Sequence, residues 1–234
     1  MPLTTDYFFS QLNSAYMKKI LFLLMATMAM LYSCKKASTN SDELGGDTNI
    51  PLNTVGNTFS PTVYVNGNYV NIISDIKITK SVNGVNTIKI IADLSQSTTL
   101  SSFNNLIPSS MKDSLGRVNL TANFRMTSTG IQDWANNDNK GFIAVKYEGN
   151  VGDQYVMKKS NGNTITRSIT QKSTTDDFGY GFYLIKTITV EQNTFIPGIK
   201  KYIAKFNHKF GLVYFEVQAE DGSVGSSYIF PQNY

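Results

Sequence analysis

The stretch VNLTANFRM, residues 118–126, decides the fold class because apolar and polar side chains alternate along it. Successive side chains of a β-strand point to opposite faces, so a period of two places every apolar residue of the stretch on one face. That face consists of Val118, Leu120, Ala122, Phe124 and Met126. We therefore expect a strand with one face in a hydrophobic core and the other in solvent.

The same alternation recurs on both sides of this stretch. Three further segments carry apolar residues at every second position, with Ser74 as the one interruption. Their apolar residues are Val70, Ile72, Ile76 and Ile78; Ile88, Ile90, Ala92 and Leu94; and Val213, Phe215, Val217 and Ala219. We expect each of the three sets to form one apolar strand face.

Turn signals stand between the alternating segments. They are the dipeptides Asn66-Gly67, Asn83-Gly84, Asn161-Gly162 and Asp221-Gly222. Each suits a type I′ turn, whose two central residues need positive φ, so the strands are expected to pair as antiparallel hairpins. The sequence thus predicts an all-β fold, a sandwich or curved half-barrel of about eight to ten strands joined by Asn-Gly hairpins.

The β domain is expected to occupy residues 58–234 as a single unit, which is long enough to bury a substantial core. The one helix candidate covers residues 100–107, because Pro108 would end it, and a loop is the alternative for so short a segment. The formal net charge is +4, and the lysines are spread along the chain. This distribution argues against a nucleic-acid partner, whose recognition requires clustered basic residues.

A signal peptide is expected over residues 17–33. Lys18 and Lys19 provide a positive start, and the segment 20–31 is apolar apart from Thr27. This apolar run is too short to span a bilayer, which takes about 20 residues, whereas it fits the core of a secretory signal. Residues 1–16 fit no such signal, so we interpret them as a mis-assigned N-terminal extension and expect translation to start at Met17.

The residues that end this run, Leu31, Ser33 and Cys34, resemble the lipobox of bacterial lipoproteins, with the form found in the Bacteroidota. The resemblance implies cleavage between Ser33 and Cys34, a diacylglyceryl group on the Cys34 sulfur and an acyl chain on its amine. Two or three such chains would anchor the protein stably in a membrane. The implied location is the cell envelope, at the outer membrane, on a periplasmic or a surface face.

The segment after the lipobox, residues 34–57, is rich in Ser, Thr, Asn, Asp and Gly. Such a composition is typical of a flexible tether. Further along, residues 149–211 resemble the C-terminal part of uncharacterised Bacteroidota lipoproteins, a resemblance that implies no activity. Because Cys34, the one cysteine of the chain, would carry lipid, the resemblance also leaves no thiol for a disulfide.

Three aromatic residues are candidates for ligand contacts: Trp134, Tyr180 and Tyr183. Flat aromatic faces stack on sugar rings, and the neighbouring Asn and Asp side chains could bind hydroxyl groups. Alternatively, Trp134 folds inward and fills the core. The oxygen-rich loop around Trp134 lacks the spacing of an EF-hand calcium loop, so we expect no metal site there.

Two functions remain open. The first is a non-catalytic module that binds a glycan or an envelope protein, or has a structural role. The second is a hydrolase, such as a glycosidase, that would use the carboxylates Asp176, Asp177 or Glu148. The chain contains no GxSxG elbow, P-loop, HExxH or dinucleotide motif and has one histidine, His208, so no cofactor or metal is expected.

Overall fold

A computed structural model describes residues 44–95, 107, 109–136 and 138–232, which belong to one compact unit, Asn40–Tyr234. The expected lipidation site at Cys34, the signal peptide and the N-terminal extension lie outside the described residues. So does all but the last residue of the helix expected over 100–107. Among the described residues, no helix is long and apolar enough to cross a membrane.

The described residues form fifteen strands and two short 3-10 helices. The strands are β1 (Thr58–Val65), β2 (Asn68–Val70), β3 (Ile73–Val82), β4 (Val85–Asp93), β5 (Val118–Thr127), β6 (Gly130–Asp133), β7 (Phe142–Lys146), β8 (Gln154–Lys158), β9 (Thr164–Lys172), β10 (Phe178–Tyr180), β11 (Tyr183–Ile185), β12 (Ile188–Asn193), β13 (Ile199–Asn207), β14 (Gly211–Ala219) and β15 (Val224–Pro231). The 3-10 helices are η1 (Pro51–Asn53) and η3 (Ser109–Met111). The all-β class is confirmed. The strands outnumber the expected eight to ten, and β2, β10 and β11 account for three of the fifteen. Each of these has only three residues, too few for a recognisable alternation.

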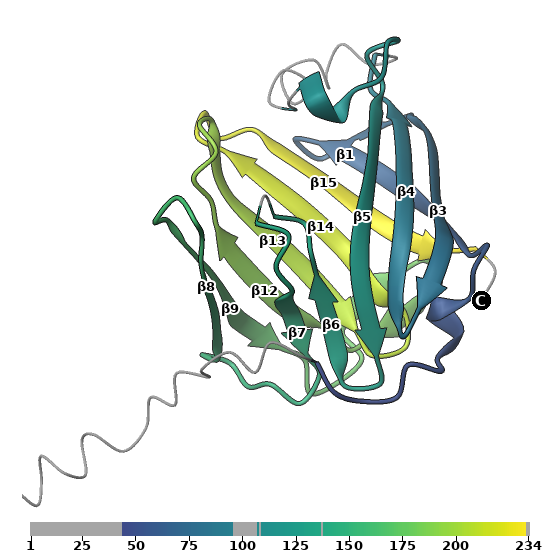
Figure 1. Cartoon of the computed structure of the whole chain (residues 1–234), viewed down its shortest axis with the longest axis vertical. Helices are drawn as coiled ribbons and strands as arrows, with labels where there is room; N and C mark the ends of the chain where they lie inside the picture. Colours follow the sequence, from purple (N-terminus) through teal and green to yellow (C-terminus); the bar gives the residue numbers. More distant parts are fainter. Residues whose placement is uncertain (1–43, 96–106, 108, 137, 233–234) are drawn as a thin grey trace, which may run out of the picture. The chain divides into compact units, whose positions relative to one another are not determined.

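Thirteen of these strands form one antiparallel sheet. Its order is β7-β6-β5-β4-β3-β1-β15-β14-β13-β12-β9-β8, with β2 paired to β1. The pairing of the first and last strands, with Phe59 opposite Pro231, joins the two halves of the chain. Figure 1 shows the sheet curling so that β6 and β7 stand in front of β12, β13 and β14. The fold is therefore the curved half-barrel, with β10 and β11 as a separate hairpin.

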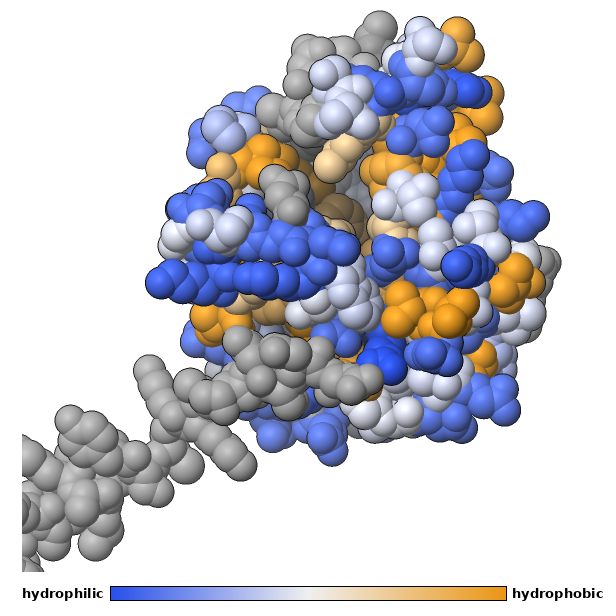
Figure 2. All heavy atoms as spheres, in the orientation of Figure 1, coloured by the Kyte–Doolittle hydropathy of each residue, from blue (hydrophilic) through white to orange (hydrophobic). Residues whose placement is uncertain are grey.

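The concave face of the sheet encloses the main core. The alternating residues of β5 contribute Phe124 and Met126, as their period predicts. Other strands contribute Ile78, Ile88, Val145, Ile169, Val190 and Phe206, among others. Figure 2 shows a mostly hydrophilic surface with apolar residues visible in a hollow between the β8–β9 side and the β4–β5 side. A second small cluster, Val65 and Val70 with Val63, Ile72 and Leu94, extends the core.

The four expected hairpin turns all join neighbouring antiparallel strands. Two have the predicted I′ geometry, with φ of 49° and 78° at Asn66-Gly67 and of 51° and 75° at Asn83-Gly84. At Asn161-Gly162 and Asp221-Gly222 only the glycine has positive φ. In both, the glycine N–H bonds a carbonyl three residues back. This geometry is a type I turn followed by a glycine in the left-handed region. It is the commonest hairpin connection after the two-residue I′ and II′ turns.

One predicted strand face is wrong at Val213. A register shift between Lys205 and Phe206 inserts an extra residue into β14, so that Phe206 pairs with Leu212. Leu212 therefore packs against the main core, while Val213 is fully buried on the opposite face, against the β10–β11 hairpin. A β-bulge of this kind reverses the side-chain parity on one side of the insertion.

The segment 44–57, which we call the strap, differs from the expected tether. Leu44 and Leu52 are buried, and Leu52 belongs to the main core. The Asn53 amide donates to the Thr48 carbonyl at 2.6 Å and to the Met126 carbonyl at 2.9 Å. The strap thus closes one end of the sheet, which we call the strap end.

The strap end also carries the turns β3–β4, β5–β6 and β13–β14. Thr127 and Thr129 of the β5–β6 turn both donate hydroxyl hydrogen bonds to the Gly45 carbonyl, at 2.7 and 2.5 Å. At the β13–β14 turn, a Cβ on Gly211 would lie 3.3 Å from Leu52. The connection from β9 to β12, which contains β10 and β11, lies at this end because β9 and β13 run toward it.

Side chains link the two edges of the sheet order, β7 and β8. The Arg167 guanidinium of β9 forms a 2.6 Å ion pair with Asp133 of β6 and lies 4.2 Å from the centre of the Phe142 ring in β7. The Lys146 N–H of β7 donates to the Tyr155 hydroxyl of β8 at 3.1 Å. These links hold the two edges together.

Candidate functional site

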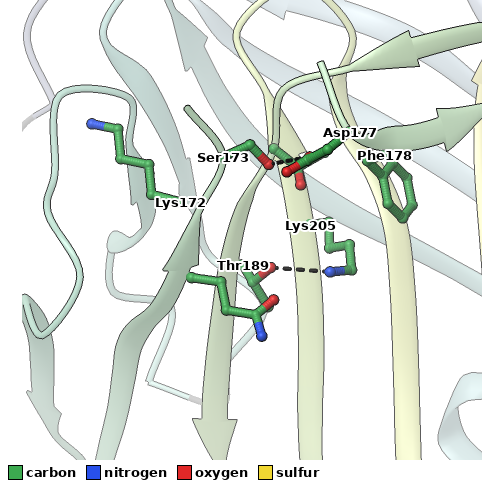
Figure 3. Close-up of a pocket in the computed structure, with 8 residues that line it drawn as sticks. Lys172, Ser173, Asp177, Phe178, Thr189 and Lys205 are labelled. Carbon is green, nitrogen blue, oxygen red and sulfur yellow. Dashed lines mark hydrogen bonds between the residues drawn. The ribbon is translucent and has the colours of Figure 1, made fainter. Parts of the chain in front are cut away.

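A polar recess of about 350 Å³ lies on the convex face of β9, β12 and β13, beneath the segment that leads into β10. Figure 3 shows the side chains that line it. They are Gln171, Lys172, Ser173, Asp177, Phe178, Thr187, Thr189 and Lys205. A volume at the lower end of the usual 300–1,000 Å³ range for small-molecule pockets suits a ligand about the size of one sugar.

Strand alternation positions the floor of the recess. In β12 the apolar residues Ile188 and Val190 face the main core, so Thr187 and Thr189 face outward. Thr189 pairs with Gln171 in β9 and with Lys205 in β13, which brings three polar side chains into one row. Both threonines are buried, although their hydroxyls belong to the convex face.

Lys205 provides the cation of the recess. Its Nζ donates to the Thr189 hydroxyl at 3.1 Å and lies 5.3 Å from the centre of the Phe178 ring. Burial lowers the pKa of Lys205 below its usual value, while the negative charges of Glu216 and Asp177 oppose that shift. The ammonium group is thus partly shielded from water and has two acidic neighbours.

Asp177 provides the carboxylate of the recess. Its Oδ1 accepts a 2.6 Å hydrogen bond from the Ser173 hydroxyl, and the side chain is otherwise exposed. Figure 3 shows Asp177 above Lys205, both near Phe178, while the end of the Lys172 side chain points away from them. The Lys172 ammonium instead donates to the Gly149 carbonyl at 2.8 Å.

The residues that line the recess therefore include a cationic donor, an anionic acceptor, hydroxyls and an amide. Such a mixture matches a ligand whose groups both donate and accept hydrogen bonds. Sugar hydroxyls do both. Phe178 adds an apolar edge, although its ring already contacts Tyr214 at 6.1 Å and Tyr228 at 5.8 Å.

The two candidate tyrosines have different surroundings. Tyr180 is 3% exposed: its ring stacks on Phe230 at 4.6 Å, and its hydroxyl donates to the Ile229 carbonyl at 2.5 Å. Burial raises the pKa of Tyr180. Its ring thus serves to attach the β10–β11 hairpin to the sheet. Tyr183 is 69% exposed, so its ring is available for contacts.

Trp134 lies directly after β6 and level with the middle of β5, where its N–H donates to the Asn123 carbonyl at 3.0 Å. It is half-buried, and a Cβ on Gly141 would lie 3.2 Å from its ring. In the loop that follows, Asn136 bonds both the N–H and the carbonyl of Lys140, and Asp138 accepts from Ser160. These oxygens are used within the protein. The structure does not bring Trp134 together with Tyr180 and Tyr183.

The three candidate carboxylates are all exposed. Asp177 lines the recess, whereas Asp176 and Glu148 do not. His208, the one histidine, lies in the exposed turn between β13 and β14. Within the described ranges, no group of three His, Cys, Asp or Glu side chains could hold a metal ion.

Comparisons with known proteins yield one structural likeness. No family model matches the chain, and no curated protein matches it. A solved structure from Bacteroides fragilis, described as an exported protein with a YmcC-like fold, has a TM-score of 0.46 and 10% sequence identity. The likeness covers 77% of this chain and 97% of that one. At this identity and TM-score it assigns neither a family nor a function.

Lys205, Thr187 and Thr189 are the site residues that sequence reasoning missed. The signal was weak: a lysine or threonine on the polar face of a strand is ordinary in any half-buried sheet. Only the segment 173–178, which returns over β12 and β13, turns these surface positions into the floor of a recess. Asp177 was named from the sequence as a candidate carboxylate of a hydrolase, and the structure places it on the wall of the recess.

Proposed function

We propose that this chain is a lipid-anchored cell-envelope lipoprotein whose β domain binds a glycan of the envelope without catalysing a reaction. The anchor rests on the resemblance of Leu31, Ser33 and Cys34 to a lipobox. The exported Bacteroides protein with which the chain shares its structural likeness is consistent with an envelope location. Glycan binding rests on one observation: the recess combines the Lys205 donor with the Asp177 acceptor.

Binding is favoured over hydrolysis by the number of carboxylates at the site. A typical glycosidase places two carboxyl groups about 5–10 Å apart across the scissile bond. Of the eight described residues that line the recess, Asp177 is the one acid, and it is already hydrogen-bonded to Ser173. The recess therefore provides groups for holding a sugar and only half of the usual pair for cleaving one.

The test is glycan binding by the mature protein and two variants of the recess. A glycan array identifies the ligand, and calorimetry measures its affinity for the parent, Lys205→Ala and Asp177→Asn. Because hydrogen bonds to charged groups contribute about 1.5–3 kcal/mol, each variant should bind about tenfold more weakly or worse. Lys200→Ala, an exposed lysine on the same strand, is the matched control and should bind like the parent.

Three outcomes would contradict the proposal. Equal affinity of Lys205→Ala and the parent would place the ligand elsewhere on the molecule. Release of shortened sugars during incubation would favour the hydrolase, and Asp177→Asn should then abolish that release. Absence of binding across envelope and dietary glycans would leave a structural role.

A further inference from the structure

The tip of the β10–β11 hairpin carries Phe182, the most exposed large apolar residue among those that the structure describes, with two more exposed apolar residues directly after it. Phe182 is fully exposed, and Tyr183 and Leu184 are 69% and 63% exposed. Gly181, with φ of 60°, forms the first position of a two-residue turn, and Phe182 forms the second. Adjacent exposed apolar side chains of this size mark a contact with a partner or a membrane.

The body of the hairpin is firmly attached, so its tip is a fixed projection. Phe178, Tyr180 and Ile185 pack with Val213 on the convex face of the sheet. The Tyr180 ring also contacts Phe210 at 5.3 Å. Since one side of the hairpin fills this cluster, the apolar residues of its tip remain outside.

The tip points toward the strap end. Phe178 lies level with Tyr228, whereas Tyr180 lies level with Phe230, two residues further along β15. The carboxyl end of β15 pairs with the start of β1, directly after the strap. The hairpin therefore advances toward the strap end, and Gly181 and Phe182 lie beyond Tyr180 in that direction.

The lipid anchor would join the domain at this same end. Gly45 of the strap is held by the β5–β6 turn, and Leu44 is the first described residue. Cys34 precedes Leu44 by ten residues. An extended chain spans at most about 3.6 Å per residue, so acylated Cys34 keeps Leu44 within about 36 Å of the bilayer.

From these positions we infer that the β10–β11 hairpin is a second membrane contact, which inserts Phe182, Tyr183 and Leu184 into the interface of the bilayer that holds Cys34. The inference rests on the lipid anchor of the proposed function. Aromatic and leucine side chains are those that interfacial segments bury at the boundary between headgroups and acyl chains. A narrow projecting tip suits insertion into lipid, whereas a stable protein interface needs about 800 Å² from each partner.

Charges around the hairpin nearly balance. Lys186 follows β11, and Lys209 lies beside the Phe210 ring in the neighbouring turn. Asp176 and Asp177 precede β10. Lys205, whose ammonium lies 5.3 Å from the centre of the Phe178 ring, adds a third cation. Because the surplus is a single positive charge, apolar insertion rather than attraction to anionic headgroups supplies the contact, so it should persist at high salt.

The experiment places a fluorophore on the tip of the full lipidated protein. Tyr183→Cys provides a reactive thiol, because the single native cysteine is Cys34 and acylation consumes its sulfur. The protein is labelled with NBD and reconstituted into phosphatidylethanolamine–phosphatidylglycerol vesicles, with or without lipids that carry a doxyl quencher. Leu115→Cys, 71% exposed at the opposite end of the sheet near the start of β5, is the matched control.

The expected result is blue-shifted, doxyl-quenched emission from the label at 183 and neither effect from the label at 115. Adding Phe182→Ser and Leu184→Ser to the 183 variant should abolish both effects while circular dichroism stays unchanged. Emission from 183 that resembles that from 115, or that survives the double change, overturns the hairpin contact while the anchor stands. An intact mass that shows Cys34 unacylated overturns the anchor and this inference with it.

Discussion

Tyr180 joins an apolar ring cluster to a hydrogen bond with the β15 backbone. Its hydroxyl donates to the Ile229 carbonyl, and burial raises its pKa. In the same cluster, burial and a hydrogen bond to Glu216 raise the pKa of Tyr214 to about 12. Both tyrosines thus keep their protons in the folded protein at pH values where they ionise in the unfolded chain, near pH 10.

Tyr180→Phe should lower the free energy of unfolding by about 1 kcal/mol at pH 7, because it removes one buried hydrogen bond. Above pH 10 the unfolded chain binds fewer protons than the folded one, so the stability of the parent should fall as pH rises from 10 to 12. The lowered pKa of Lys205 acts in the opposite sense as pH rises toward 10.5, the ordinary pKa of a lysine. The variant should show a shallower alkaline fall in urea denaturation followed by circular dichroism.

Tyr69→Phe is the matched control for the neutral-pH measurement, because Tyr69 is 63% exposed. It should change the free energy of unfolding by less than about 0.5 kcal/mol. If Tyr180→Phe lowers the free energy of unfolding no more than this control does, the hydrogen bond to the Ile229 carbonyl makes no net contribution to stability.

The strap illustrates how a few apolar residues can order a polar segment. Its composition predicts a tether, yet Leu52 and Ile50 reach the main core and Asn53 bonds two backbone carbonyls. The mean composition of the strap does not predict its order, because a mean gives every position the same weight. Packing depends instead on which side chains reach the core. Similarly, the bulge at Val213 is invisible in an alternating sequence until the register of β13 and β14 is known.

Leu52→Ala should lower the free energy of unfolding by about 2–5 kcal/mol, the range for truncating a buried leucine. Val55→Ala, three residues away and 56% exposed, should cost less than about 0.5 kcal/mol. Urea titrations of the two variants and the parent supply the comparison. Equal stabilities of the two variants would mean that the strap does not close the core in solution.

The curled sheet depends on side chains where its order ends. Arg167 reaches from β9 to Asp133 in β6, and also donates to the Phe142 carbonyl of β7 at 3.2 Å and to Gln192 of β12 at 2.7 Å. The Arg167 and Asp133 side chains are 12% and 6% exposed. Removing one member of a buried pair leaves the other charge without its partner, which is costly.

Arg167→Met should therefore lower the free energy of unfolding by about 3–5 kcal/mol. Adding Asp133→Asn should recover part of this loss, because the remaining buried charge is then removed. Lys201→Met breaks the more exposed pair with Glu191 and should cost at most about 1 kcal/mol. Thermal unfolding of the parent and the three variants measures these differences in stability. If Arg167→Met lowers the stability no more than Lys201→Met does, the Arg167–Asp133 pair does not hold the two edges together.

Strand existence and hairpin position followed from local sequence. The period of two in residues 118–126 and the four turn dipeptides act over a few neighbouring residues, so they predict β5 and the hairpins without knowledge of the rest of the chain. The recess, the Arg167 link and the hairpin tip depended on tertiary structure. Lys205 meets Asp177, and Arg167 meets Asp133, only because the sheet curls and the β9–β12 connection folds back over it. No local sequence pattern predicts that these residues lie close together. Each pair joins separate strands or loops, whose positions are set by the packing of the whole core.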